Sequence, residues 1–229
     1  MKIAVIQFPG SNCDQDALWS LRSDLGVEAE YVWHGERSLA GFDGAFIPGG
    51  FTYGDYLRCG AIAGQSQVMQ AVREMADSGR PVLGACNGFQ ILCETGILPG
   101  ALVQNIDQRF VCKTIHLRTE NRDSAWTTKC PDVLPIPVAH GEGRFVADDE
   151  TLRELNGDGR VAFRYCDEAG DLTEESNFNG SVESIAGVLN KRGNVLGMMP
   201  HPERVTSKKI GSEAGLPIIS GFLSVLANA

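Results

Sequence analysis

Cys86 stands two residues after Gly84 and two before Gly88, at the point where an apolar run ends and a helical pattern begins. A strand that ends in small-x-nucleophile-x-small and turns directly into a helix is the pattern of a nucleophile elbow, here with cysteine in place of serine. The small residues let strand and helix approach each other, and the first helical turn favours a thiolate over a thiol. The pattern predicts a reactive thiol; a buried packing cysteine is the alternative.

Among the four histidines, His201 has the most constrained position, because a proline flanks it on each side. Pro200 and Pro202 fix their own φ angles and push their neighbours towards extended geometry, so residues 199–203 are predicted to form an extended, non-helical loop. Residues two apart in extended chain share a side, which predicts that Glu203 orients the His201 imidazole as the acid of a catalytic triad. Taken alone, the segment is more typical of a rigid surface turn, and only together with the predicted elbow does it favour a triad.

The glycine pair Gly49 and Gly50 follows a predicted strand end. Attack of a thiolate on an amide carbonyl creates an oxyanion that needs preorganised N–H donors, and the backbones of Gly50 and Asn87 are the candidates. Gly49, Phe51 and Gln90 are candidate substrate contacts. A plain turn at the glycine pair, and a helix-surface or core-edge position for Gln90, are the alternatives.

The elements that must position these residues alternate over the first hundred residues. Strands are predicted at 2–8, 28–33, 44–48 and 81–86, and helices at 13–25, 60–78 and 87–95. This alternation is typical of an α/β fold with a mostly parallel, doubly wound sheet flanked by helices. In such folds ligands bind at the carboxyl ends of the strands, where the predicted elbow and the glycine loop both lie.

The second half of the chain is predicted to be an antiparallel or mixed, β-rich extension of the sheet. Its strand candidates are Phe110–Leu117, Ile136–Val138, Arg160–Tyr165 and Ile185–Asn190, followed by a final strand at 195–199 and a closing helix at 214–227. No linker, repeat or low-complexity segment divides the chain. We therefore expect one domain over residues 1–229.

Composition excludes several classes of function. The chain has 29 acidic and 20 basic residues and a net charge of −9, which argues against nucleic acid and anionic membranes as partners. Its seven cysteines are scattered without CxxC pairs, which predicts a reducing, cytoplasmic setting and no metal site. The other six cysteines (13, 59, 93, 112, 130 and 166) are expected to be packing residues, and His34 and His116 structural ones.

The segments GACNGFQ and MMPHPER together resemble the class I (triad) glutamine amidotransferases. Four further segments, AVIQFPGSNCDQD, FIPGGFTYGDYLRCGAIA, VAHGEGRF and GNVLGMMPHPER, resemble more closely the glutaminase subunits of one purine-biosynthesis enzyme in that family. These motifs span the chain from end to end. The resemblance implies that Cys86, His201 and Glu203 form a catalytic triad that hydrolyses L-glutamine.

The resemblance also implies a place in a larger assembly. The ammonia would pass to a large synthetase subunit, accompanied by a small accessory subunit, for ATP-dependent conversion of formylglycinamide ribonucleotide to formylglycinamidine ribonucleotide. This chain shows no Walker loop, so ATP and Mg²⁺ are expected on the synthetase and no cofactor or metal on this chain. The loops Tyr53–Arg58 and Ala139–Arg144 are candidates for the mouth of the site or the subunit interface; solvated loops are the alternative.

Two rival functions fit the sequence less well. A cysteine hydrolase of the α/β-hydrolase type also uses an elbow, but its triad acid precedes the histidine by many residues, whereas Glu203 follows His201 by two. A non-catalytic regulatory subunit with the same fold would be expected to lack one of the triad residues, and all three are present.

Overall fold

The computed structural model describes residues 1–227 of the chain. Its first apolar run forms strand β1 (Lys2–Gln7), which is covered on both faces. Ile3 and Val5 pack in the core on one side of the sheet, and Ala4 and Ile6 pack in the core on the other. Because successive strand residues point to opposite faces, a strand buried on both sides must be apolar throughout. This explains the uninterrupted apolar runs of the first hundred residues.

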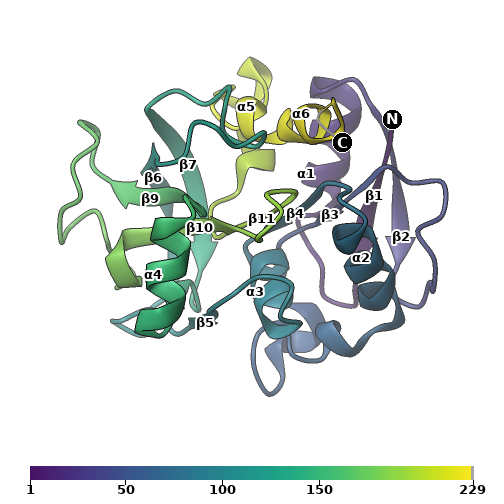
Figure 1. Cartoon of the computed structure of the whole chain (residues 1–229), viewed down its shortest axis with the longest axis horizontal. Helices are drawn as coiled ribbons and strands as arrows, with labels where there is room; N and C mark the ends of the chain where they lie inside the picture. The colour runs from purple at the N-terminus through teal and green to yellow at the C-terminus, as the bar shows by residue number, and fades with distance from the viewer. Residues whose placement is uncertain (228–229) are drawn as a thin grey trace.

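A nine-stranded sheet in the order β2-β1-β3-β4-β11-β10-β9-β6-β7 forms the centre of the fold. The first five strands in this order are parallel and the remaining pairs are antiparallel. In Figure 1, β1 and β2 lie on one side of the molecule and β6, β7 and β9 on the other. Besides β1, the strands are β2 (Glu28–Trp33), β3 (Gly44–Ile47), β4 (Val82–Ala85), β6 (Val111–Thr119), β7 (Val133–His140), β9 (Val161–Cys166), β10 (Ile185–Leu189) and β11 (Val195–Met198). The predicted α/β class with an antiparallel extension is confirmed.

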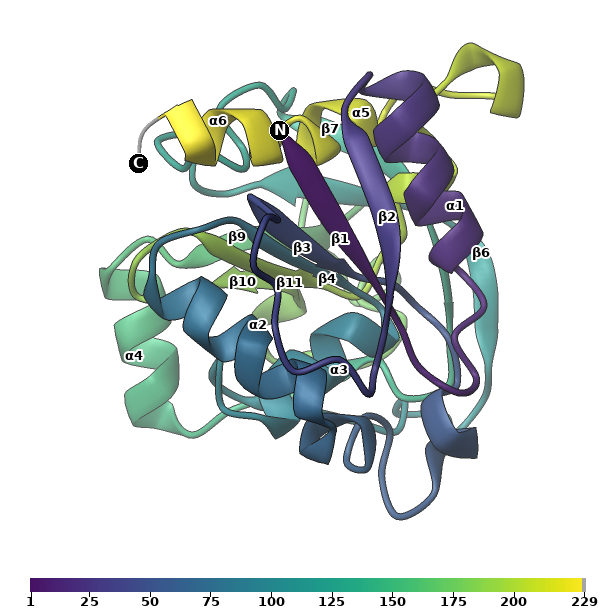
Figure 2. The same cartoon turned by 90° about the vertical axis from the view of Figure 1, so that its right-hand side faces the viewer.

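Helices cover both faces of this sheet. Figure 2 shows α2 and α3 on one face and α1, α5 and α6 on the other, with α4 on the same side as α2. The helices are α1 (Asp14–Trp19, continued by a π-helical turn over Ser20–Asp24), α2 (Gln67–Asp77), α3 (Asn87–Glu94), α4 (Asp149–Gly157), α5 (Leu216–Ile219) and α6 (Gly221–Ala227). Over residues 1–227, none of them is both long enough and apolar enough to cross a membrane.

Outside the candidate site, three predictions of local structure are wrong. The closing helix predicted over 214–227 is two short helices, α5 and α6, separated at Ser220. The helix predicted over 60–78 begins only at Gln67, because Gly60 has a φ of +82°, Ala63–Gln65 form a short 3₁₀ turn and Ser66 is extended with a ψ of 154°. Helix α4 falls in the segment predicted to be β-rich, as does the small two-stranded sheet of β5 (Ala101–Val103) and β8 (Arg144–Val146). The side chain of Asp148 caps α4 by accepting from the Thr151 N–H at 2.8 Å, a helix signal present in the sequence.

Candidate active site

Cys86 occupies the single residue between strand β4 and helix α3. Its φ of 51° and ψ of −110° lie in a region that non-glycine residues rarely adopt, at a cost of about 1–3 kcal/mol. The strand holds this turn in place, because the Cys86 N–H donates to the Met198 carbonyl of neighbouring β11 at 2.8 Å. The thiol therefore stands at the carboxyl edge of the parallel sheet and at the N-terminus of a helix.

The two glycines of the elbow allow the strand and helix to come together. A Cβ on Gly84 would lie 2.8 Å from the carbonyl carbon of Gly88, and a Cβ on Gly88 would lie 1.9 Å from the carbonyl oxygen of Ile47 on β3. No side chain fits at either position without displacing backbone. Both positions meet the steric demand that the elbow pattern predicts.

His201 and Glu203 meet as a buried pair, with His201 Nδ1 2.7 Å from Glu203 Oε1. The extended, non-helical loop predicted for residues 199–203 is wrong in part, because Pro202–Arg204 form a 3₁₀ turn. Proline at the first helical position has the φ that a helix needs and loses no hydrogen bond there. The turn, rather than extended alternation, brings the carboxylate to the imidazole.

His201, Cys86 and Cys13 converge on Gly49. A Cβ at Gly49 would lie 2.7 Å from His201 Cε1, 3.1 Å from Cys13 Sγ and 3.3 Å from Cys86 Cβ, so only glycine leaves room for the three side chains. Cys13 was expected to be a packing residue. It is buried, with 2% of its surface exposed, but it lies against the imidazole that serves Cys86.

The electrostatic setting of His201 favours its protonated form. Burial alone would lower the pKa of His201, but the charges of Glu203 and Cys86 and hydrogen bonding to the thiols of Cys13 and Cys86 raise it well above its ordinary value. A protonated imidazole beside a thiol stabilises the thiolate and holds a proton ready for a leaving group. The arrangement can therefore supply both a nucleophile and an acid.

Two adjoining hollows of about 100 and 170 Å³ open onto Cys86. Gly50, Phe51, Phe110 and Ala139 line both of them together with the nucleophile. Phe51 and Phe110, 47% and 55% exposed, lie with ring centroids 6.3 Å apart at the rim. Phe51 was predicted as a substrate contact; Phe110 was predicted only as the start of a strand.

The backbone N–H groups of Gly50 and Asn87 are free to bind an anion. Within residues 1–227, neither N–H donates to a protein acceptor, although the neighbouring Phe51 N–H is used by the Gly10 carbonyl at 2.9 Å. Gly50 is held against the chain at Gly10 and Ser11, where a Cβ would meet backbone atoms at 2.7 and 2.8 Å. The role of these two donors in an oxyanion site stays a prediction.

A chain of side-chain hydrogen bonds joins the elbow helix to the mouth of the site. The Asn87 side-chain amide donates to Gln90 Oε1 at 2.8 Å, and Gln90 Nε2 donates to the Glu142 carbonyl at 2.6 Å. Gln90 is buried yet lines the larger hollow, as do Gly141 and Glu142. Part of the predicted mouth loop Ala139–Arg144 therefore borders the site, as does Asp55 of the loop Tyr53–Arg58.

The comparison with protein families agrees with this geometry. The model of the CobB/CobQ-like glutamine amidotransferase domain matches residues 1–214, most of the chain. The chain belongs to this glutamine amidotransferase family. The subunits named "Phosphoribosylformylglycinamidine synthase subunit PurQ" from two strains of Thermus thermophilus are each 52% identical to this amidotransferase over 231 residues, covering 99% of this chain and 100% of theirs.

Solved structures give the same result. A chain in the structure of PurLQS from Thermotoga maritima matches this amidotransferase with a TM-score of 0.86 and 40% identity, over 98% of both chains. A glutamine amidotransferase from Thermotoga maritima, 15% identical, matches with a TM-score of 0.59 over 100% of this chain and 96% of its own, which shows the shared fold alone. The resemblance stated from the sequence motifs is confirmed at the level of the family.

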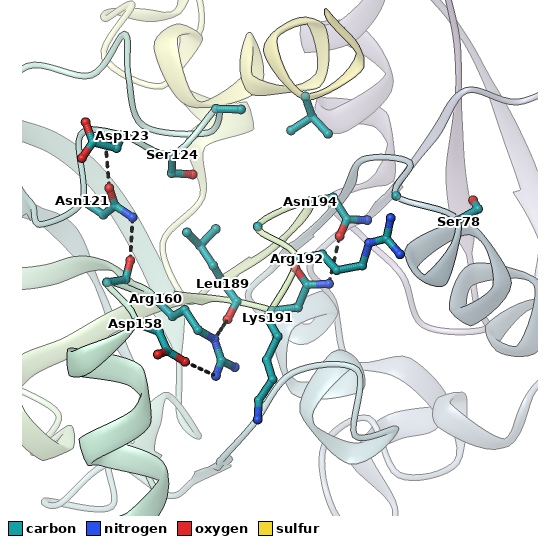
Figure 3. Close-up of a pocket in the computed structure, with 16 residues that line it drawn as sticks. Ser78, Asn121, Asp123, Ser124, Asp158, Arg160, Leu189, Lys191, Arg192 and Asn194 are labelled. Atoms are coloured by element: carbon teal, nitrogen blue, oxygen red, sulfur yellow. Dashed lines mark hydrogen bonds and ion pairs between the residues drawn. The ribbon is translucent and has the colours of Figure 1, made fainter. Parts of the chain in front are cut away.

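A third hollow, of about 530 Å³, lies at the other end of the strands from Cys86, before the amino-terminal ends of β4 and β11 (Figure 3). Two of its three basic groups lie near carboxylates: Lys191 Nζ is 3.1 Å from Glu154, and Arg160 Nη1 is 3.8 Å from both Glu154 and Asp158. The third, Arg192, donates to the Asp77 carbonyl at 3.0 Å. No cysteine or histidine lines it within the described part of the chain. The smaller hollows at Cys86 are therefore the candidate active site.

His140 is among the residues that line the larger of the two hollows at Cys86, and its burial makes the stability of the amidotransferase fold depend on pH. His140 Nδ1 lies 3.1 Å from Asn105 Oδ1, and burial together with the charge of His201 lowers the pKa of His140 to about 4. Since the unfolded value is about 6.5, the unfolded chain binds more protons between those two pH values. Stability must therefore fall as the pH falls through this window.

We expect His140 to account for about 3 kcal/mol of lost unfolding free energy between pH 6.5 and 4. Urea unfolding of the wild type and His140→Gln across this range measures the effect. The variant, which cannot titrate at this position, should lose less stability on acidification by about that amount. Identical pH slopes for the two proteins would contradict a neutral, buried His140.

Proposed function

We propose that this chain is the glutaminase subunit of a phosphoribosylformylglycinamidine synthase, and that it hydrolyses L-glutamine at Cys86 with His201 and Glu203. The observation that carries the proposal is the buried His201–Glu203 pair at 2.7 Å beside a thiol on a strained elbow. The names of the relatives from Thermus thermophilus and the match to PurLQS support the choice of enzyme.

In the first half of the reaction, the Cys86 thiolate attacks the side-chain amide carbon of glutamine. The oxygen becomes an anion, to which the N–H groups of Gly50 and Asn87 donate. As the C–N bond breaks, His201 gives its proton to the departing nitrogen, which leaves as ammonia. The product on the protein is a γ-glutamyl thioester on Cys86.

In the second half, the neutral His201 imidazole takes a proton from water, and the resulting hydroxide attacks the thioester carbonyl. Glu203 keeps Nδ1 protonated, so that Nε2 faces the reaction, and stabilises the imidazolium when it forms again. The C–S bond breaks, glutamate leaves and the Cys86 thiolate returns. Each turnover therefore converts glutamine and water to glutamate and ammonia.

Ammonia released into water would be protonated and lose its nucleophilicity, so the proposal includes a receiving partner. A larger synthetase subunit would bind ATP, Mg²⁺ and formylglycinamide ribonucleotide, and a small accessory subunit would complete the assembly. This chain itself would carry no cofactor. The cytoplasmic setting predicted from the cysteines belongs to the same proposal.

The experiment that tests this function compares glutamate release by the isolated chain and by the chain mixed with the synthetase, its substrates and the small subunit. We expect slow hydrolysis alone and at least tenfold faster hydrolysis in the complex, because partner binding often completes catalytic geometry. An Arg192→Ala chain, changed at the remote hollow, serves as the control and should respond to the partner like the wild type. Fast hydrolysis at the same rate with and without the synthetase would contradict activation by the partner.

A further inference from the structure

The larger hollow at Cys86 contains polar side chains that the proposed reaction leaves without a role. Its volume is about 170 Å³, and Asp55, His140 and Glu142 line it beside the nucleophile. Asp55 comes from the loop Tyr53–Arg58, and His140 is the last residue of β7. Within the described part of the chain, the lining includes two carboxylates but no lysine or arginine. The hollow is therefore acidic.

His140 has one ring nitrogen without a partner. Its Nδ1 lies 3.1 Å from Asn105 Oδ1, and the Asn105 amide is oriented by its own donation to the His140 carbonyl at 3.0 Å. The Gly143 N–H donates to the same Oδ1 at 3.1 Å, so this oxygen is an acceptor and Nδ1 carries the ring hydrogen. Nε2 is then an acceptor. His140 is 3% exposed, and its Nε2 is buried without a hydrogen-bond partner in residues 1–227.

A second unpartnered acceptor belongs to Asp55. Its Oδ1 is buried and has no hydrogen-bond partner among the described residues, although the residue as a whole is partly exposed. The loop is held at Tyr53, whose hydroxyl lies 2.9 Å from His34 Nδ1 and whose N–H donates to the Pro9 carbonyl at 2.7 Å. Asp55 therefore lines the hollow before any ligand binds. A donor from a bound molecule would remove the cost of leaving these two acceptors unpaired.

The other groups in the lining do not neutralise the acidic charge. Burial and the charge of Asp55 raise the pKa of the Cys59 thiol, which also lines the hollow and stays neutral. Burial lowers the pKa of His140 to about 4, so its imidazole is neutral too. Burial also raises the pKa of the Asp55 carboxyl, as expected for an acid without a counter-charge. A primary ammonium group has one positive charge and three N–H donors, which suits such a hollow.

On the basis of the proposed glutaminase function, we propose that this hollow binds the α-ammonium group of L-glutamine, with Asp55 as its counter-charge and His140 Nε2 as a neutral acceptor. The carboxamide carbon must lie at Cys86, so an ammonium group held in the same hollow orients the substrate between its two ends. An amide without the charged amino group would leave buried acceptors unpaired and bind poorly. Asp55 and His140 would thus select free glutamine over other amides, such as the glutamine side chains of proteins.

Alkylation of Cys86 in the reconstituted complex tests this site without glutamine turnover. One reagent is a chloromethyl ketone analogue of glutamine, which carries the α-ammonium group; the other is iodoacetamide, which does not. We expect Asp55→Asn to slow labelling by the chloroketone about 10–100-fold, the effect of losing a hydrogen bond to a charged group, and to leave labelling by iodoacetamide unchanged. Mass spectrometry of the peptide that contains Cys86 measures both rates.

Asp123→Asn is the matched control, because it changes an exposed carboxylate at the 530 Å³ hollow, and it should be labelled like the wild type. His140→Phe keeps a ring but removes the acceptor, and it should slow labelling by the chloroketone alone. Undiminished labelling of Asp55→Asn by the chloroketone, or equal slowing with both reagents, would overturn the proposal.

Steady-state kinetics give a second, independent measurement. Asp55→Asn should raise KM for glutamine by a factor similar to the slowing of labelling while kcat stays near the wild-type value, because the ammonium contact is made equally in the ground state and the transition state. A fall in kcat with unchanged KM would contradict binding of the ammonium group. If Cys86→Ala abolishes glutamine-dependent synthesis but Asp55→Asn is labelled like the wild type, this inference fails and the proposed function stands.

Discussion

In the reconstituted synthase, Cys86→Ala should abolish glutamine-dependent product formation while synthesis from added ammonium salt continues. We expect glutamine-dependent turnover to fall by about 10⁴–10⁶-fold, the range seen when a member of a catalytic triad is removed. The reason is that the variant has no nucleophile to form the thioester, whereas the synthetase can still use ammonia from solution. Product formation from each nitrogen source measures the two activities side by side.

Cys93→Ala is a matched control, because it removes a buried thiol from the same helix α3 without touching the site. It should keep both activities. Loss of the ammonium-dependent activity in Cys86→Ala would show that the substitution disturbs the assembly rather than the chemistry. Persistent turnover with glutamine would show that another residue is the nucleophile.

Glu203→Gln is expected to lower glutamine hydrolysis by roughly 10⁴-fold, close to the effect of removing the acid of other triads. The glutamine side chain keeps the size of the residue but removes the charge that, with Cys86 and Cys13, holds the pKa of His201 high. Steady-state kinetics of the complex measure the loss. Glu154→Gln, a surface carboxylate on α4, is the control and should behave as the wild type.

The pH profile separates a positioning role of Glu203 from a purely structural one. Because Glu203 raises the pKa of His201, its removal should move the alkaline limb of kcat/KM, where the imidazolium loses its proton, to lower pH. A structural defect would reduce the rate without moving the limb. If Glu203→Gln has a wild-type rate of hydrolysis and an unchanged alkaline limb of kcat/KM, Glu203 is not a member of the triad.

The sequence was sufficient to predict the elbow, because the elbow depends only on residues that are close together in the sequence. Gly84 and Gly88 are needed within two residues of Cys86, and the structure shows backbone at both positions where a Cβ would stand. The alternation of apolar segments likewise predicted the parallel half of the sheet. His201 and Glu203 were paired from their spacing, although a 3₁₀ turn, not extended chain, joins them.

Residues that reach the site only through the tertiary fold could not be found in this way. Cys13 follows the first strand, and Phe110 directly precedes β6, far along the chain from Cys86. No local pattern ties these residues to a nucleophile 24 or more positions away in the sequence. Helix α4 is a different case, because the cap at Asp148 was a readable signal that the β-rich interpretation of its neighbours overrode.

The central claim is that the nitrogen of the product comes from glutamine hydrolysed at Cys86. An isotope experiment tests it most directly. The complex is supplied with glutamine carrying a heavy isotope in its amide nitrogen, together with unlabelled ammonium salt, and the product is analysed by mass spectrometry. The account predicts labelled formylglycinamidine ribonucleotide from the wild type and only unlabelled product from Cys86→Ala. Labelled product from the Cys86→Ala complex would contradict it.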